Sequence, residues 1–171
     1  MRKTGKPTNA VNSKYLGELA ESIFQTEALK RNFVVSKPWG DNQSYDYVLE
    51  NNHGKLFKIQ VKSSARYAKG DRGYNFNVGK GSSGKNAKKD GSGLDANGEQ
   101  RKAGKAPYKL GEVDFYCCYH HIEKNWHLLP ERAIESEDDP GVLLQNIKVS
   151  MAEGTKYSSY KDQWEVFNES L

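Results

Sequence analysis

The chain has 171 residues, 36% of them apolar, so its length allows one domain with a modest hydrophobic core. No stretch approaches the roughly 18 uninterrupted apolar residues that a membrane helix needs, and the basic residues at 1–7 have no apolar run behind them, as a secretory signal would. The formal charge is +4, and the two cysteines, Cys117 and Cys118, are adjacent and would point to opposite faces of a strand, so we expect a soluble cytoplasmic protein with reduced thiols and no membrane partner.

A helix over residues 13–31 is the first expected element. Residues 1–12 suit a flexible basic tail, which leaves residues 13–171 as a single domain. Ser13 is a suitable N-cap, and Asn32 tolerates the left-handed conformation that ends many helices. The helix carries one apolar stripe at helical spacing, made of Leu16, Leu19, Ala20, Ile23 and Phe24. We expect this stripe to pack on a sheet.

Three strands are predicted next, over residues 33–35, 45–50 and 55–63. The segment between the last two, Asn51-Asn52-His53-Gly54, has the composition of a turn, so these two strands should form a hairpin turning at residues 52–53. Side chains alternate along a strand. Phe57, Ile59 and Val61 therefore share one face of the last strand, and Gln60 and Lys62 share the other.

The second half of the chain alternates between loop and strand signals. From residue 79 to about 109 it is dominated by Gly, Ser, Lys, Asn and Asp, which indicates a loop insertion without a core of its own. The remaining predicted elements are strands over 74–78, 113–119 and 126–130, a helical turn over 131–135 and a short helix over 158–167. This order predicts an α/β fold in which a mixed sheet is flanked by helices.

Positive charge is concentrated in the middle of the chain. Residues 62–109 carry 12 Lys and Arg against 4 Asp and Glu, whereas residues 110–171 carry 5 against 12. Such a segment suits a polyanion, because binding to phosphates releases condensed counterions, although a solvated lysine-rich loop has the same composition. The residues predicted to contact DNA are Lys80, Lys85, Lys88, Lys89, Arg101, Lys102 and Lys105.

The hairpin brings together side chains that suit phosphodiester chemistry. Asp46 is expected across the hairpin from Ile59 and Gln60, and Lys62 shares the strand face of Gln60. A carboxylate can hold Mg²⁺, which neutralises phosphate charge and generates hydroxide from bound water. A nearby lysine can orient that water or stabilise developing negative charge. Taken singly, each residue favours a plainer interpretation: Asp46 begins a strand, and Gln60 and Lys62 belong to a solvated strand face.

A second carboxylate is expected from the helix over residues 13–31. Glu18 and Glu21 lie three residues apart and are neighbours on one helix surface. Glu21 falls near the edge of the apolar stripe and Glu18 nearly opposite it, so Glu21 is better placed to reach over the sheet. The candidate catalytic set is Glu21, Asp46, Gln60 and Lys62, with Glu18 as the alternative helix residue.

Four segments of the chain form an ordered pattern, namely Gly17-Glu18-Leu19-Ala20-Glu21, Phe33-Val34-Val35, Gly40-Asp41-Asn42-Gln43-Ser44-Tyr45-Asp46 and Phe57-Lys58-Ile59-Gln60-Val61-Lys62-Ser63. The pattern resembles the PD-(D/E)XK nuclease superfamily. It looks most like the small homing endonucleases associated with group I introns and, more distantly, like archaeal Holliday junction resolvases. The resemblance covers residues 14–64 well and the strands at 113–119 and 126–130 only loosely.

The resemblance implies a restriction-endonuclease-like core and metal-dependent cleavage of DNA. In such nucleases the motif aspartate, the helix glutamate and the first residue of the (D/E)-x-K element hold the metal. Carried over, Asp46, Glu21 and Gln60 would bind Mg²⁺, or Mn²⁺ as a substitute, and Lys62 would be the catalytic lysine. Gln60 departs from the carboxylate of most of the superfamily, although homing endonucleases of this type resemble this chain in using glutamine. An amide oxygen can ligate Mg²⁺ but lacks the charge.

Three functions remain open on this basis. The first is a site-specific homing endonuclease that cuts double-stranded DNA. The second is a Holliday junction resolvase or a restriction-like nuclease, and the third is a nuclease-derived DNA-binding protein that no longer cuts. For a nuclease we expect a homodimer or homotetramer, because one active site cuts one strand and a paired cut needs two.

Overall fold

A five-stranded mixed sheet forms the centre of the protein. The computed structural model describes residues 13–40, 42–68, 73–80 and 107–169. The sheet has the order β1-β2-β3-β5-β6, in which β3 and β5 are parallel and the other neighbours antiparallel. Its strands are β1 (Val34–Ser36), β2 (Tyr47–Glu50), β3 (Leu56–Ser64), β5 (Phe115–His120) and β6 (Asn125–Pro130). The single parallel pair makes the sheet mixed, as predicted.

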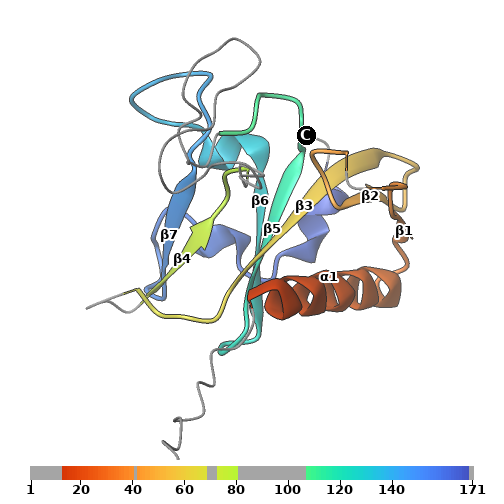
Figure 1. Cartoon of the computed structure of the whole chain (residues 1–171), viewed down its shortest axis with the longest axis horizontal. Coiled ribbons are helices and arrows are strands. Elements are labelled where there is room, and N and C mark those ends of the chain that lie inside the picture. Colours follow the sequence, from red (N-terminus) through yellow and green to blue (C-terminus); the bar gives the residue numbers. More distant parts are fainter. Residues whose placement is uncertain (1–12, 41, 69–72, 81–106, 170–171) are drawn as a thin grey trace, which may run out of the picture.

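Helix α1 (Ser13–Lys30) packs along one face of this sheet (Figure 1). It buries Ala20 and Phe24 of the predicted apolar stripe, and Ala28, which extends the stripe toward the C-terminus of the helix. The helix ends one residue earlier than predicted. Asn32 follows with a φ of 62°, the left-handed conformation expected of it, which turns the chain into β1.

The other face of the sheet is covered by strands. A second, two-stranded sheet pairs β4 (Gly73–Asn77) with β7 (Asn146–Ser150), and its side chains share a core with Tyr116, Cys118 and Leu129 of the main sheet. The sequence predicted β4 but not β7, although Ile147 and Val149 alternate with polar neighbours and are buried. On this side, therefore, a small sheet stands where a flanking helix was expected.

The helix predicted over residues 158–167 is wrong in type. The region forms two short 3-10 segments, η2 (Ser158–Tyr160) and η3 (Trp164–Phe167). Asp162 lies between them with a φ of 54°, and its Oδ1 accepts a hydrogen bond of 2.8 Å from the Trp126 N–H. The left-handed backbone and the bond to β6 interrupt any continuous helix. The predicted helical turn is present as the 3-10 segment η1 (Glu131–Ile134).

Alternation along the central strands separates two hydrophobic cores. Phe57, Ile59 and Val61 of β3 belong to the core that includes α1, as predicted. In β5, Cys117 lies in this core and Cys118 in the core shared with β4 and β7, and both are free thiols. The intervening residues of β3 therefore face away from α1, toward the β4–β7 side.

The β2–β3 hairpin positions Asp46. Tyr47 pairs with Ile59, and the backbone N–H of Asp46 donates a hydrogen bond of 2.8 Å to the oxygen of Ile59. Compared with the pairing expected from a turn at residues 52–53, the observed register is shifted by one residue. The turn is longer than predicted, because Asn51 Oδ1 accepts hydrogen bonds from the backbone N–H groups of His53 and Lys55. The shift leaves Asp46 beside residue 60 of β3.

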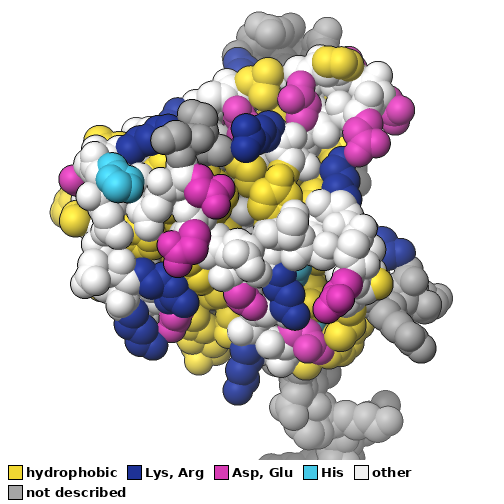
Figure 2. Space-filling model, turned by 180° about the vertical axis from the view of Figure 1, so that it is seen from behind, with side chains coloured by type: hydrophobic (Ala, Val, Ile, Leu, Met, Phe, Trp, Pro, Cys, Tyr) yellow, Lys and Arg dark blue, Asp and Glu magenta, His cyan; other side chains and the backbone are white. Residues whose placement is uncertain are grey.

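The surface of the described residues carries charges of both signs. On the face shown in Figure 2, basic and acidic side chains are interspersed rather than gathered by sign. Half of the 12 Lys and Arg residues of 62–109 fall within 81–106, and those residues, like the expected tail at 1–12, lie outside the described ranges. No helix within the described ranges combines the length and apolar character needed to cross a membrane.

Candidate active site

Asp46 lies directly before the start of β2, at the point where β3 continues beyond β2 and stays paired only with β5. Its Oδ2 accepts a hydrogen bond of 2.7 Å from the Val61 N–H and one of 2.5 Å from Gln60 Nε2. Burial raises the pKa of Asp46 above its ordinary value and the charge of Glu21 raises it further, although the Val61 hydrogen bond acts in the opposite direction. A cation beside Asp46 would offset the effects of both burial and the neighbouring carboxylate.

Glu21 of α1 is held near the start of β2, close to Asp46. The Tyr47 hydroxyl donates a hydrogen bond of 3.3 Å to the backbone oxygen of Glu21, which ties the helix to the strand. Glu21 Oε2 lies 3.0 Å from Nζ of Lys37, in the loop after β1. The hydrogen bond to Glu21 raises the pKa of Lys37, and attraction to Asp46 adds to this effect. One ammonium is thus stabilised by both carboxylates, which marks a position that favours a cation.

Glu18 does not share this arrangement. Its side chain is 64% exposed, and its salt-bridge partner is Lys14 in the same helix, at 3.7 Å. Of the two glutamates predicted from the sequence, the structure therefore brings Glu21 toward Asp46 and leaves Glu18 on the exposed side of the helix. Lys37 was not predicted, because a single lysine in a loop carries no pattern that distinguishes it from other surface lysines.

Gln60 and Lys62 share a face of β3, as predicted, and Tyr108 joins them. Gln60 is only 8% exposed, and its Oε1 accepts a hydrogen bond of 3.0 Å from the Tyr108 hydroxyl. The oxygen of the same hydroxyl accepts a hydrogen bond of 3.3 Å from Nζ of Lys62. Tyr108 was absent from the predicted catalytic set, because 48 residues separate it from Gln60 and no local pattern connects them.

Lys80 is the one predicted DNA-contacting residue that falls within the described ranges. Its Nζ lies 2.6 Å from Oε2 of Glu112 and 5.2 Å from the centroid of the Tyr108 ring. Lys80 and Tyr108 thus lie side by side, although residues 81–106 separate them in the chain. The other predicted contacts lie outside the described residues, namely Lys85, Lys88, Lys89, Arg101, Lys102 and Lys105.

The side chains that converge here fit a hard divalent cation. Among the described residues, no three His, Cys, Asp or Glu side chains lie close enough together to hold a metal ion. Asp46 and Glu21 supply two carboxylates, and Gln60 supplies an amide, so all available donors are the oxygens that Mg²⁺ prefers. An amide ligates through its oxygen only, which makes the orientation of the Gln60 side chain decisive.

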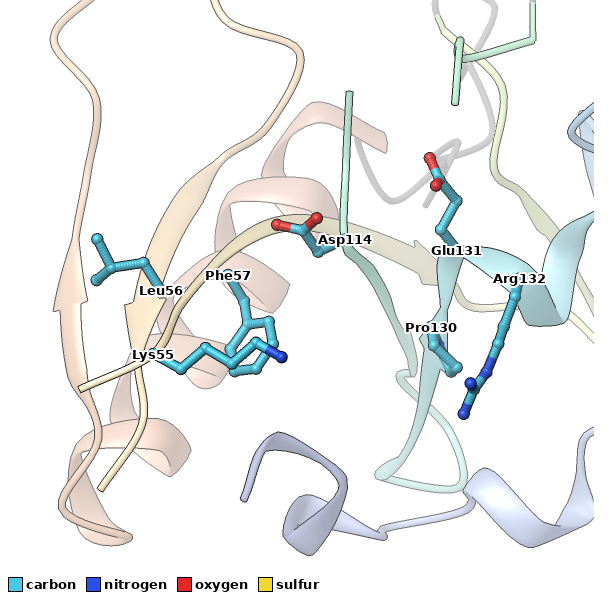
Figure 3. Close-up of a pocket in the computed structure, with 7 residues that line it drawn as sticks. All are labelled: Lys55, Leu56, Phe57, Asp114, Pro130, Glu131 and Arg132. Carbon is cyan, nitrogen blue, oxygen red and sulfur yellow. The ribbon is translucent and has the colours of Figure 1, made fainter. Parts of the chain in front are cut away.

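A separate hollow lies at the other end of the sheet (Figure 3). It measures about 280 Å³ and is lined by Lys55, Leu56, Phe57, Asp114, Pro130, Glu131 and Arg132. These residues come from the start of β3, the approach to β5, the end of β6 and the start of η1, whereas Gln60 and Lys62 follow later in β3. The hollow shares no residue with the candidate site, and the chemistry described above does not involve it.

Comparison with known proteins identifies the fold and the family. The sequence pattern of the PD-(D/E)XK endonuclease family matches residues 11–164. No curated protein matches. Among solved structures, the fold is similar to that of a bacterial homing endonuclease, I-Ssp6803I, with a TM-score of 0.58 and 22% sequence identity over 91% of this chain and 90% of that chain.

These findings confirm the resemblance recognised in the sequence. The likeness in fold agrees with a restriction-endonuclease-like core built on a mixed sheet. The family match extends over most of the chain and includes Glu21, Asp46, Gln60 and Lys62. The protein therefore belongs to the PD-(D/E)XK endonuclease family and is a hydrolytic nuclease.

Proposed function

We propose that this nuclease is Mg²⁺-dependent and hydrolyses phosphodiester bonds in double-stranded DNA at a specific site. The observation that supports this most strongly is the convergence of two carboxylates, an amide and an ammonium near the start of β2. Asp46 is hydrogen-bonded to Gln60, and Glu21 acts electrostatically on Asp46. Lys62 approaches the same amide through the shared Tyr108 hydroxyl.

Each of the four residues has a distinct part in the proposed reaction. Asp46 and Glu21 would hold the metal through carboxylate oxygens, and Gln60 through its amide oxygen. Mg²⁺, when bound, neutralises phosphate charge and generates hydroxide from water; Mn²⁺ is expected to substitute. The ammonium of Lys62 stabilises the negative charge that develops on the phosphate oxygens or orients the attacking water. The scissile phosphate accordingly lies over residues 60–62 of β3.

The DNA duplex is expected to extend over the loop between β1 and β2. That loop carries Lys37 and also Trp39, whose side chain is fully exposed. A large aromatic side chain that is exposed beside a catalytic site suits contact with a partner. Trp126 and Trp164 are each 4% exposed, so a change in tryptophan fluorescence on adding DNA would report mainly on Trp39.

Homing-type specificity is supported by the likeness in fold to a homing endonuclease. A symmetric homodimer or homotetramer would bring two sites to the two strands of a duplex. The amide of Gln60 also favours a second candidate, a DNA-binding protein of nuclease origin that no longer cuts, because an uncharged ligand holds a divalent cation less strongly than a carboxylate does.

The proposal is tested by cleavage of a plasmid library that carries random inserts and of a synthetic four-way junction. Each substrate is incubated with the full chain in MgCl₂, in MnCl₂ or in EDTA. Site-specific cleavage predicts a linear product whose sequenced ends share one motif, with no product in EDTA. Cleavage of the junction regardless of its sequence would identify a resolvase. Binding without cleavage under every metal condition would instead support the inactive DNA-binding protein.

A further inference from the structure

We propose that Tyr108 is a positioning residue of this active site, and that its hydroxyl holds the amide of Gln60 and the ammonium of Lys62 in one fixed arrangement. The proposal rests on the function proposed above, because it assigns Tyr108 a role within that site. Tyr108 acts through Gln60 and Lys62, the two residues that it contacts and to which direct roles in the reaction are assigned above.

The hydroxyl of Tyr108 lies between the two side chains and uses both of its hydrogen-bonding capacities. It donates to Gln60 Oε1 at 3.0 Å and accepts from Lys62 Nζ at 3.3 Å. The ammonium of Lys62 also lies 5.4 Å from the centroid of the Tyr108 ring, within the range of a cation–π contact. Lys62 is therefore held by the hydroxyl and by the ring of the same residue.

Tyr108 is itself firmly placed. It is 8% exposed, and its ring packs edge-on against Tyr116 with a centroid separation of 5.5 Å and an interplanar angle of 75°. Burial raises the pKa of Tyr108 well above its ordinary value, and the charges of Asp46 and Glu112 add to the effect. The placement of the hydroxyl 3.0 Å from Gln60 Oε1 gives it the role of a hydrogen-bond donor.

A glutamine needs such a partner more than a glutamate would. The two oxygens of a carboxylate are equivalent, whereas the two ends of an amide differ and only the oxygen can ligate a metal. Because Lys62 already donates to the Tyr108 oxygen, the hydroxyl proton is directed at Gln60 and selects the amide oxygen. The amide nitrogen donates to Asp46 Oδ2 at 2.5 Å, and the amide oxygen keeps a second lone pair with which to ligate a metal. Tyr108 thereby fixes which end of the amide faces which neighbour.

The test compares Tyr108→Phe with Tyr116→Phe in the full chain. Tyr116 is a matched control, because its buried hydroxyl has no hydrogen-bond partner among the described residues and its ring packs against the same tyrosine. The first readout is the side-chain NH₂ signal pair of Gln60 in a ¹H–¹⁵N correlation spectrum, assigned by its loss in Gln60→Glu. Tyr108→Phe should shift this pair, and Tyr116→Phe should leave it in place.

The second readout is the kinetics of cleavage with Mg²⁺. Tyr108→Phe should lower kcat on the order of 10- to 100-fold with little change in KM, since small misplacements of catalytic groups have effects of this size. Adding Gln60→Glu to Tyr108→Phe should restore part of kcat, because a carboxylate has no wrong end. A structural role alone would lower the melting temperature and give no such rescue.

Failure of this proposal is distinct from failure of the proposed function. An unchanged Gln60 signal pair, or a kcat equal to that of the parent, would overturn the role of Tyr108 while the nuclease assignment stands. A parent protein that cuts no DNA with any metal would overturn the proposed function. In that case the Gln60 signals alone would decide whether Tyr108 holds the amide.

Discussion

Nζ of Lys37 lies 3.0 Å from Oε2 of Glu21, so an ammonium already neutralises one of the proposed metal ligands. A metal cation would compete with that ammonium for the same carboxylate. Lys37→Ala should therefore tighten Mn²⁺ binding by roughly two- to five-fold, since an ion pair this exposed contributes on the order of 0–1 kcal/mol. Calorimetric titration of the full chain with MnCl₂ measures this, and Lys14→Ala, which removes the partner of Glu18, should leave affinity unchanged. Weaker binding would mean that Lys37 holds Glu21 in place instead.

Removing either proposed carboxylate ligand should abolish cleavage and spare DNA binding. Asp46→Asn and Glu21→Gln are expected to lower kcat by roughly 10²-fold or more, because the metal contributes several kcal/mol to the transition state. Asp114→Asn is a matched control, since Asp114 Oδ2 accepts a hydrogen bond of 2.7 Å from the Lys58 N–H much as Asp46 does from Val61. Plasmid cleavage and gel-shift affinity are measured together.

Two results of that comparison would change the assignment. Cleavage at the parent rate by Asp46→Asn would remove Asp46 from the site. Loss of activity in Glu18→Gln together with an active Glu21→Gln would move the helix ligand to Glu18 and leave the rest of the set in place.

Residue 60 should tolerate a carboxylate better than a truncation. Gln60→Glu keeps an oxygen ligand, adds negative charge and can still accept the hydrogen bond from Tyr108, whereas Gln60→Ala removes the ligand altogether. We expect Gln60→Glu to retain more activity than Gln60→Ala at every Mg²⁺ concentration and to reach half-maximal rate at a lower one. Magnesium titrations of the cleavage rate decide the point. Parent-like behaviour of Gln60→Ala would place residue 60 outside the metal site.

The basic segment, residues 62–109, should bind DNA through contacts to phosphates rather than to bases. Its lysines alternate with Gly and Ser, and contacts to phosphate strengthen all sequences alike. Neutralising Lys85, Lys88 and Lys89 together should weaken binding to target and non-target DNA by similar factors. Each lost phosphate contact should reduce the slope of log affinity against log salt by roughly 0.9. Binding is measured at several salt concentrations; an unchanged slope would show that these lysines do not touch phosphate.

The free energy of unfolding should decrease as the pH is lowered, because the protein buries a histidine, His127. His127 is 1% exposed, and burial lowers its pKa to about 4, with the charges of Lys161 and His120 acting in the same direction. The unfolded chain takes up this proton near pH 6.5, so the stabilisation is complete above that pH and is lost as the pH falls toward 4, a difference of about 3 kcal/mol. Urea unfolding at pH 7 and pH 4.5 should show a smaller pH dependence in His127→Gln than in the parent.

Much of the candidate site could be predicted because it lies in one hairpin. Asp46, Gln60 and Lys62 fall within 17 residues of each other, and the period of two along β3 is enough to place Gln60 and Lys62 on one face. Helix α1 was predictable to within one residue for the same reason, since its apolar stripe and the capping tendency of Asn32 are local properties.

Other features depend on contacts between distant parts of the chain. β7 pairs with β4 across about 70 residues, and its short alternation becomes a strand only because the exposed edge of β4 is there to pair with it. The helix predicted over residues 158–167 is broken by Asp162, whose carboxylate is engaged by Trp126 of β6. Such partners are invisible to any window of neighbouring residues.

The sequence by itself determined the family, the central hairpin and the chemical types present at the site, since these depend on residue identity and on spacing along one or two elements. Only the tertiary structure shows that Glu21, and not Glu18, pairs with Lys37 and acts on Asp46, because this depends on how α1 packs on the sheet and on a residue from another loop. Only the tertiary structure brought Tyr108 to Gln60 and Lys62. A hydrogen bond between residues 48 positions apart is set by how the whole chain closes around β3, and no local periodicity encodes it.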